Sequence, residues 1–177
     1  MIALAFLALP SLANAAESKA RSWGVENEEM ARFEAKVVDL LCELSGDCPA
    51  NCGEGRRQMG LLRTDGKLLI VAKNGQPIFS GAAEDLLPYC GKHVEVDGLL
   101  TGHGPTRVYQ IQFIKEVGAE KFSKTNRWSK SWAKKFPDAK KQKGPWFRKD
   151  PRVKKLIERD GYLGLGLDVD KKFKEDW

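Results

Sequence analysis

The chain has 177 residues, of which 42% are hydrophobic and 31% are charged, and its formal net charge is +6. This length suits one domain of ordinary size, or a small domain with appendages. After residue 15 no segment approaches the roughly 20 apolar residues that a helix needs to cross a bilayer, which excludes a membrane span from the rest of the chain and leads us to expect a soluble mature protein.

The first fifteen residues are typical of a secretory signal peptide. Residues 2–12 are apolar apart from Pro10 and Ser11, and residues 13–15 supply the small-x-small pattern that signal peptidases cleave. We expect cleavage after Ala15 and a periplasmic or secreted mature protein. No Lys or Arg precedes the apolar run, so we expect the true start of the reading frame to lie upstream. A buried or anchoring helix is the alternative, which Pro10 disfavours.

Residues 26–45 have the apolar period of an amphipathic helix. Acidic residues occupy its first turn, where the helix dipole favours negative charge, and Gly46 ends the pattern. We therefore predict, over residues 16–55, an N-terminal helix followed by a Cys-rich loop. The apolar residues at three- and four-residue steps are Met30, Phe33, Val37, Leu40, Leu41 and Leu44.

Four cysteines, Cys42, Cys48, Cys52 and Cys90, are an even number, which in an oxidising compartment favours two disulfides. The sequence leaves all three connectivities open. A zinc or iron–sulfur site is the alternative, but the spacings C-x5-C and C-x3-C differ from the C-x2-C pairs typical of such sites. We therefore predict disulfides, with no metal and no cofactor.

From residue 57 onwards short strands are expected. Residues 58–63, 67–73 and 77–79 are separated by Asp-Gly at 65–66 and Asn-Gly at 74–75, the strongest short hairpin signals.

A helix and two further strands follow. Ser80 is a helix N-cap residue, and the helical pattern stops near Pro88. Residues 93–101 and 107–117 are strand-like and are joined by a turn at 102–105.

The predicted order of three strands, one helix and two strands is that of a five-stranded OB-fold barrel. The segments DGKLLIVAKNG and YCGKHVEVDGLL resemble the small OB-fold domains of bacterial exported proteins, in which a Gly-Lys-x-Val-x-Val-x-Gly strand follows the helix. The resemblance covers residues 56–117 and implies an α+β fold with an OB-like barrel. Its matching residues are Gly91, Lys92, Val94, Val96 and Gly98.

Two OB-fold families with known chemistry do not fit. The exported haem chaperone of cytochrome c maturation has a His-x-x-x-Tyr motif, whereas His103 and Tyr109 are six residues apart and His93 has Asp97 four residues later. The sequence also lacks a recognisable Arg, Asp and Glu constellation of the staphylococcal-type nucleases. We interpret His93 as structural. His103 is the better candidate of the two for contact with a ligand, and a solvent-exposed turn residue is the alternative. The sequence favours a protein without catalytic residues.

Charge divides the chain into an acidic body and a basic extension. Residues 1–114 have eleven Lys or Arg against fourteen Asp or Glu, whereas residues 115–160 have sixteen against six. Such asymmetry predicts an anionic partner or an acidic protein surface for the extension, which we place at residues 118–177.

The extension is predicted to contain two helices, at residues 125–136 and 150–161, joined by an aromatic linker. In the first helix the aromatic residues recur at four-residue steps among basic ones. The predicted partner-binding residues are Trp128, Trp132, Phe136, Lys130, Lys134, Lys135, Trp146 and Phe147.

Three interpretations of this aromatic stripe stay open: packing on the barrel or the N-terminal helix, docking on another exported protein, and binding of a polyanion. We favour a non-catalytic periplasmic accessory or scaffold module that docks on a larger exported complex through the extension. The alternative is an OB-fold binding domain for an anionic oligomer, a glycan or a nucleic acid, contacted by Lys67, Lys73, His103 and Arg107.

Overall fold

The computed structural model describes residues 17–73, 81–104 and 106–175. It divides into two compact units, residues 1–125 and residues 126–177. The predicted signal peptide and the short strand predicted at 77–79 lie outside the described residues. In the part of the chain that is described, no helix is long and apolar enough to cross a membrane.

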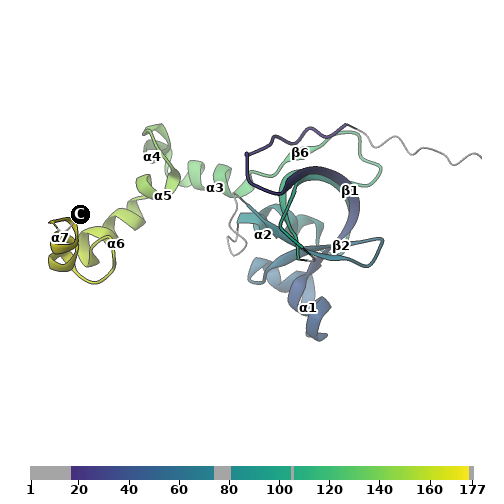
Figure 1. The fold of residues 1–177 in the computed structure, drawn as a ribbon, viewed down its shortest axis with the longest axis horizontal. Coiled ribbons are helices and arrows are strands. Elements are labelled where there is room, and N and C mark those ends of the chain that lie inside the picture. Colours follow the sequence, from purple (N-terminus) through teal and green to yellow (C-terminus); the bar gives the residue numbers. More distant parts are fainter. Residues whose placement is uncertain (1–16, 74–80, 105, 176–177) are drawn as a thin grey trace, which may run out of the picture. The chain divides into compact units, whose positions relative to one another are not determined.

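The first unit is a closed barrel of five strands (Figure 1). The strands are β1 (Glu28–Asp39), β2 (Met59–Arg63), β3 (Leu68–Ala72), β4 (His93–Thr101) and β5 (Val108–Glu116). They are ordered β3-β2-β1-β4-β5, and a parallel pairing of β3 with β5 closes the circle. The two-residue strand β6 (Ser123–Lys124) pairs with β5. This confirms the α+β class and the OB-like barrel.

The helix predicted over residues 26–45 is wrong for most of its length. Residues 28–39 form strand β1, and the helix is confined to α1 (Leu40–Ser45). Strand β1 is antiparallel to β4 from Glu28↔Thr101 to Lys36↔His93, and its last residues also pair with β2. The β1 residues that contact the core are Ala31, Phe33, Ala35 and Val37, at the two-residue steps of a strand, whereas Met30 of the predicted helical face is 55% exposed. The long-range pairings thus override the local helical period.

The barrel therefore includes a strand upstream of residue 56, where the resemblance placed its start. The predicted strands at 58–63, 67–73, 93–101 and 107–117 correspond to β2, β3, β4 and β5, with α2 between β3 and β4. The fifth strand of the barrel is β1, which was predicted to be helical.

The barrel interior is filled by aliphatic side chains from all five strands and by Tyr109, which is fully buried and whose hydroxyl donates to the Ala31 carbonyl over 2.8 Å. Helix α2 (Gly81–Leu86) adds Ala82, Ala83 and Leu86 to this core. At a bulge between Asp97 and Gly98, a Cβ on Gly98 would lie 2.3 Å from the Gln110 carbonyl oxygen, so only glycine fits there.

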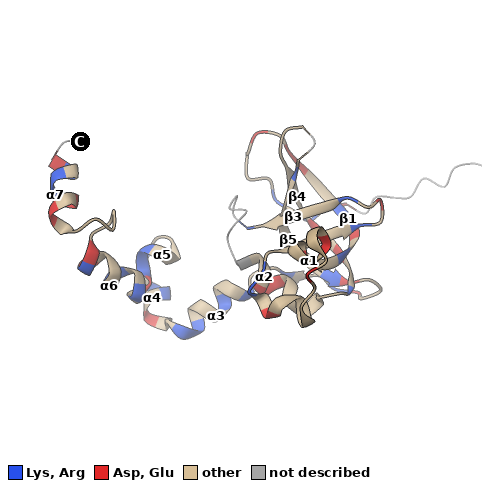
Figure 2. Cartoon of the chain, turned by 90° about the horizontal axis from the view of Figure 1, so that it is seen from below, with Lys and Arg blue, Asp and Glu red and all other residues tan. Residues whose placement is uncertain are grey.

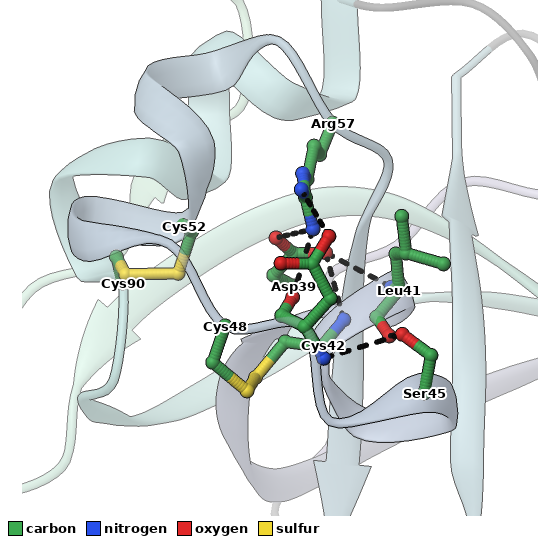
Figure 3. The surroundings of a disulfide bond; sticks show 9 residues. Asp39, Leu41, Cys42, Ser45, Cys48, Cys52, Arg57 and Cys90 are labelled. Atoms are coloured by element: carbon green, nitrogen blue, oxygen red, sulfur yellow. Dashed lines mark hydrogen bonds and ion pairs between the residues drawn. A yellow bond between two sulfur atoms is a disulfide. The ribbon is translucent and has the colours of Figure 1, made fainter.

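Both predicted disulfides are present, and the pairing is Cys42–Cys48 and Cys52–Cys90. The first links α1 to the loop after it, and the second joins the short helix η1 (Ala50–Gly55) to the residue that follows η2 (Leu87–Tyr89) (Figure 3). Asp39 is the N-cap of α1: its buried carboxylate accepts hydrogen bonds from the backbone N–H groups of Leu41 and Cys42, at 2.9 and 3.3 Å.

The chain segment ahead of β1 is held on the barrel by side chains of β4 and β5. The fully buried Asp97 carboxylate accepts hydrogen bonds from the Ser18 hydroxyl and the Lys19 N–H, both at 2.6 Å. The Gln112 side-chain amide exchanges two hydrogen bonds with the backbone of Arg21.

The second unit is helical and contains α3 (Arg127–Lys135), α4 (Pro137–Lys141), α5 (Trp146–Lys149), α6 (Pro151–Asp160) and α7 (Leu167–Glu175). The two helices predicted in the extension correspond to α3 and α6. The predicted aromatic linker contains the single turn α5, and α7 was not predicted.

Two substitutions distinguish strand β1 from a helix over residues 26–45. In such a helix Val37 and Leu44 would lie on the same buried face, so truncating either would destabilise the protein to a similar extent. Val37→Ala is expected to lower the free energy of unfolding by about 2 kcal/mol, because it opens a cavity at a fully buried position. Leu44→Ala, at a side chain that is 75% exposed, is expected to change it by less than about 0.5 kcal/mol. Equal losses in urea denaturation would contradict the strand.

Candidate functional site

The barrel carries a groove of about 590 Å³ beside strand β3 and the connection between β4 and β5. Of the four residues predicted to bind an anionic ligand, the groove is lined by Lys67 and Arg107. Arg63 and Glu29 also line it, and its floor is apolar, with Leu68, Leu69, Ile70 and Leu100. The structure thus brings two predicted cations and one unpredicted cation to a single apolar groove.

The charges of this groove are partly compensated by neighbouring carboxylates. Arg107 lies 2.9 Å from Glu29, and its Nη2 donates to the Leu100 carbonyl over 3.4 Å. Its Nε is buried and has no hydrogen-bond partner among the described residues. Arg63 stacks over the Phe33 ring at 4.8 Å. Such a site suits a ligand that combines an anionic group with an apolar surface.

Lys73 does not reach the groove. Its ammonium group lies 3.2 Å from the buried Asp85 carboxylate and donates to both oxygens of Thr125. Burial lowers the pKa of Lys73, and the attraction of Asp85 opposes that shift. We interpret Lys73 as a structural residue that ties β3 to α2, because without it the Asp85 charge would be buried and uncompensated.

The two histidines lie apart from this groove's lining. His93 is exposed at the start of β4, and His103 is exposed in the turn between β4 and β5. Across the described ranges, no group of three or more His, Cys, Asp or Glu side chains is placed to hold a metal ion. All four cysteines are in disulfides, which contradicts the alternative of a cysteine metal site.

In the second unit the predicted aromatic stripe packs against other aromatic residues of the same unit. The ring of Trp146 lies 4.4 Å from that of Trp128 and 6.4 Å from that of Trp132, measured between centroids. Trp132 is only 7% exposed and also contacts Phe136, and Phe147 contacts Trp146. Trp132 is the buried centre of this aromatic cluster, whereas Trp128, Phe136 and Trp146 are partly exposed and Phe147 is 44% exposed.

Asp150 ties this aromatic cluster to α6. Its fully buried carboxylate accepts a hydrogen bond from Trp132 Nε1 over 2.8 Å and begins α6 by accepting from the Arg152 N–H. The Arg152 guanidinium lies 2.6 Å from it and stacks over the Phe136 ring. Hydrogen bonds from Arg152 and Trp132 hold the pKa of Asp150 well below its usual range.

The predicted basic residues stay on the surface. Lys130, Lys134 and Lys135 are exposed on α3, and Figure 2 shows Lys and Arg along α3, α4 and α5. Residues 126–177 contain sixteen Lys or Arg against eight Asp or Glu. Several of these acidic residues are used locally, since Asp138 pairs with Lys141 and Asp160 with Arg159. The unit therefore presents an excess of positive charge.

Sequence reasoning missed an apolar pocket between α6 and α7, where exposed leucines and aromatics gather. The signal was the run Tyr-Leu-Gly-Leu-Gly-Leu at residues 162–167, which is unusually apolar for a connection between helices.

Comparisons with protein-family models, with curated proteins and with solved structures found no match to this chain.

The role of Asp150 predicts a pH dependence of the second unit. Because its folded pKa lies below the ordinary value of about 4, the stabilisation is present at neutral pH and is lost as the pH falls below that value. Asp150→Asn is expected to lower the thermal midpoint of the tryptophan signal at pH 7 and to shrink the difference between pH 7 and pH 3. Asp138→Asn, at an exposed pair, is the control and should leave both quantities unchanged.

Proposed function

We propose that this protein is a non-catalytic accessory or scaffold module of an exported protein complex, with the barrel as a rigid body and residues 126–177 as the docking unit. The main support for this proposal is that the boundary between the two structural units also separates an acidic part of the chain from a basic part. Backbone contacts place the boundary after Thr125. By charged-residue counts, residues 1–125 have fourteen Lys or Arg against sixteen Asp or Glu, a net of −2, whereas residues 126–177 have a net of +8.

A concentrated positive charge of this kind supports docking on an acidic surface. Such charge accelerates diffusional encounter and disfavours partners of like sign. The aromatic cluster supports the same proposal, because its ring contacts join α3 to α5 within the short basic segment. Two disulfides support an oxidising compartment, in which an exported complex resides.

The proposal is tested by isolating the mature chain, tagged ahead of residue 17, from the cell that encodes it. We expect one protein partner at stoichiometric yield. Replacing Lys130, Lys134 and Lys135 together by Gln should reduce the association rate at low salt by roughly tenfold, because the steering charge is lost.

The matched control replaces Arg56, Lys92 and Lys121 of the barrel by Gln, three exposed cations in the other unit. This change should leave the association rate within about twofold. Absence of any stoichiometric partner of the unaltered chain would refute the docking function, and equal effects of the two triple variants would refute the assignment to residues 126–177.

The barrel groove supports a second candidate function, binding of an anionic oligomer. In a titration with a sulfated oligosaccharide at 50 and 200 mM salt, affinity is expected to fall steeply with salt. Lys67→Glu should weaken binding several-fold more than Lys92→Glu, since Lys67 lines the groove and Lys92 does not. Equal effects of the two variants would show that the oligosaccharide is held by net charge alone, and the groove would then have no part in it.

A further inference from the structure

The end of the second unit exposes an unusual amount of apolar surface. Of the fourteen exposed large hydrophobic residues in the described chain, seven lie between Leu156 and Phe173. Among them, Tyr162 is 67% exposed and Leu167 is 56% exposed. Contiguous apolar surface of this kind on a protein marks a site of interaction.

Four of these side chains surround a pocket between α6 and α7. The pocket has a volume of about 900 Å³. Its apolar lining is Ile157, Tyr162, Leu163, Leu167 and Phe173. A space of this size accommodates more than one bulky side chain, as in the hydrophobic grooves that receive one face of an amphipathic helix.

The walls of the pocket are held in place by Asp170. Its carboxylate accepts hydrogen bonds from the backbone N–H groups of Tyr162 and, over 3.0 Å, Leu163. These bonds lower the pKa of Asp170. Gly161 makes the close approach possible, because it has a positive φ of 81° and a Cβ there would lie 2.8 Å from the Asp170 carboxyl carbon. The loop is thus fixed before any partner arrives, which reduces the entropy lost on binding.

We propose that this pocket receives bulky apolar side chains from an acidic segment of the partner protein. The inference rests on the docking function proposed above and adds which surface is the anchor and what enters it. The anchoring side chains come from the partner, because Trp132, the central ring of the predicted stripe, is only 7% exposed and packs within its own unit.

Charge complementarity identifies the segment as acidic. The positive charge lies on residues 126–160, which have thirteen Lys or Arg against four Asp or Glu, whereas the five charged residues of the pocket lining have a net charge of −1. The Asp and Glu of an incoming segment are therefore attracted to the basic helices that precede α7 in the chain, and its apolar side chains enter the pocket. A second copy of this chain would bring a second +8 unit and is repelled.

A lipid surface fits the pocket less well than a protein segment. The apolar lining surrounds a concave space, which a side chain enters and a bilayer surface does not. The charged residues of the lining are mixed, Glu158, Asp170 and Glu175 with Lys171 and Lys174, and do not form the cluster of cations that binds anionic headgroups.

The test compares two substitutions of the same kind, two residues apart in the same loop. Leu163 lines the pocket, whereas Leu165 is 69% exposed and does not. Both side chains are exposed, so neither Leu163→Asp nor Leu165→Asp is expected to unfold the unit, and tryptophan fluorescence checks this. With the full mature chain, L163D should reduce recovery of the partner at least tenfold, and L165D should reduce it less than twofold.

A photo-crosslinking amino acid at position 163 then identifies what enters the pocket. The expected product joins position 163 to a partner peptide that contains a bulky apolar residue flanked by Asp or Glu. The same amino acid at the exposed position 44 of the barrel is the control and should give no such product.

The outcomes separate this inference from the docking function. If the partner is recovered equally with both leucine variants and is lost only when Lys130, Lys134 and Lys135 are replaced, the docking function stands and the pocket is not the anchor. If the unaltered chain recovers no partner, both are overturned. Co-sedimentation with phosphatidylglycerol vesicles, or self-association in sedimentation velocity, that L163D abolishes would assign the pocket to a lipid surface or to a second copy and overturn the inference.

Discussion

Strand β1 pairs along one edge with β4 and, over its last residues, along the other edge with β2, and the barrel depends on this double pairing. Without it the two hairpins on either side, β2–β3 and β4–β5, would share only the short parallel contact from Ile70↔Val108 to Ala72↔Gln110. A two-stranded hairpin is marginal in water, so the shared strand makes the sheet stable. Where the β3–β5 pairing ends, the residues ahead of Ile70 line the groove.

The second unit is a short and strongly basic segment, and two effects oppose its folding. Like charges repel in a compact unit, and fewer than about 70 residues rarely supply a sufficient core. Large aromatic rings provide much buried area per residue, and the Asp150 carboxylate joins Trp132 to Arg152 at the point where charge is buried. Lys130, Lys134 and Lys135 are exposed on α3, where water solvates their charges.

The burial of Trp132 changes the interpretation of the aromatic stripe formed by Trp128, Trp132 and Phe136. Its period and its basic neighbours are those of a docking helix, yet a tryptophan that fills its own unit is not available as an anchor for another protein. The apolar surface that remains is around α6 and α7, where Asp170 holds the connecting loop against the second helix. Under the proposed docking function, recognition and folding would use different apolar residues within one unit.

Local signals in the sequence determined the disulfide chemistry, the hairpin at residues 65–66, strands β2 to β5 with helix α2 between them, helices α3 and α6, and the division of charge. These depend on residues close together in the chain or on composition. The tertiary structure decided that residues 28–39 form a strand and which cysteines pair. It also decided that Lys73 pairs with the buried Asp85, whereas Lys67 and Arg107 line one groove. The pocket between α6 and α7 is a further feature that only the tertiary structure shows. Each of these depends on contacts between distant residues, whose free energy exceeds the local preference and is absent from any short stretch of sequence.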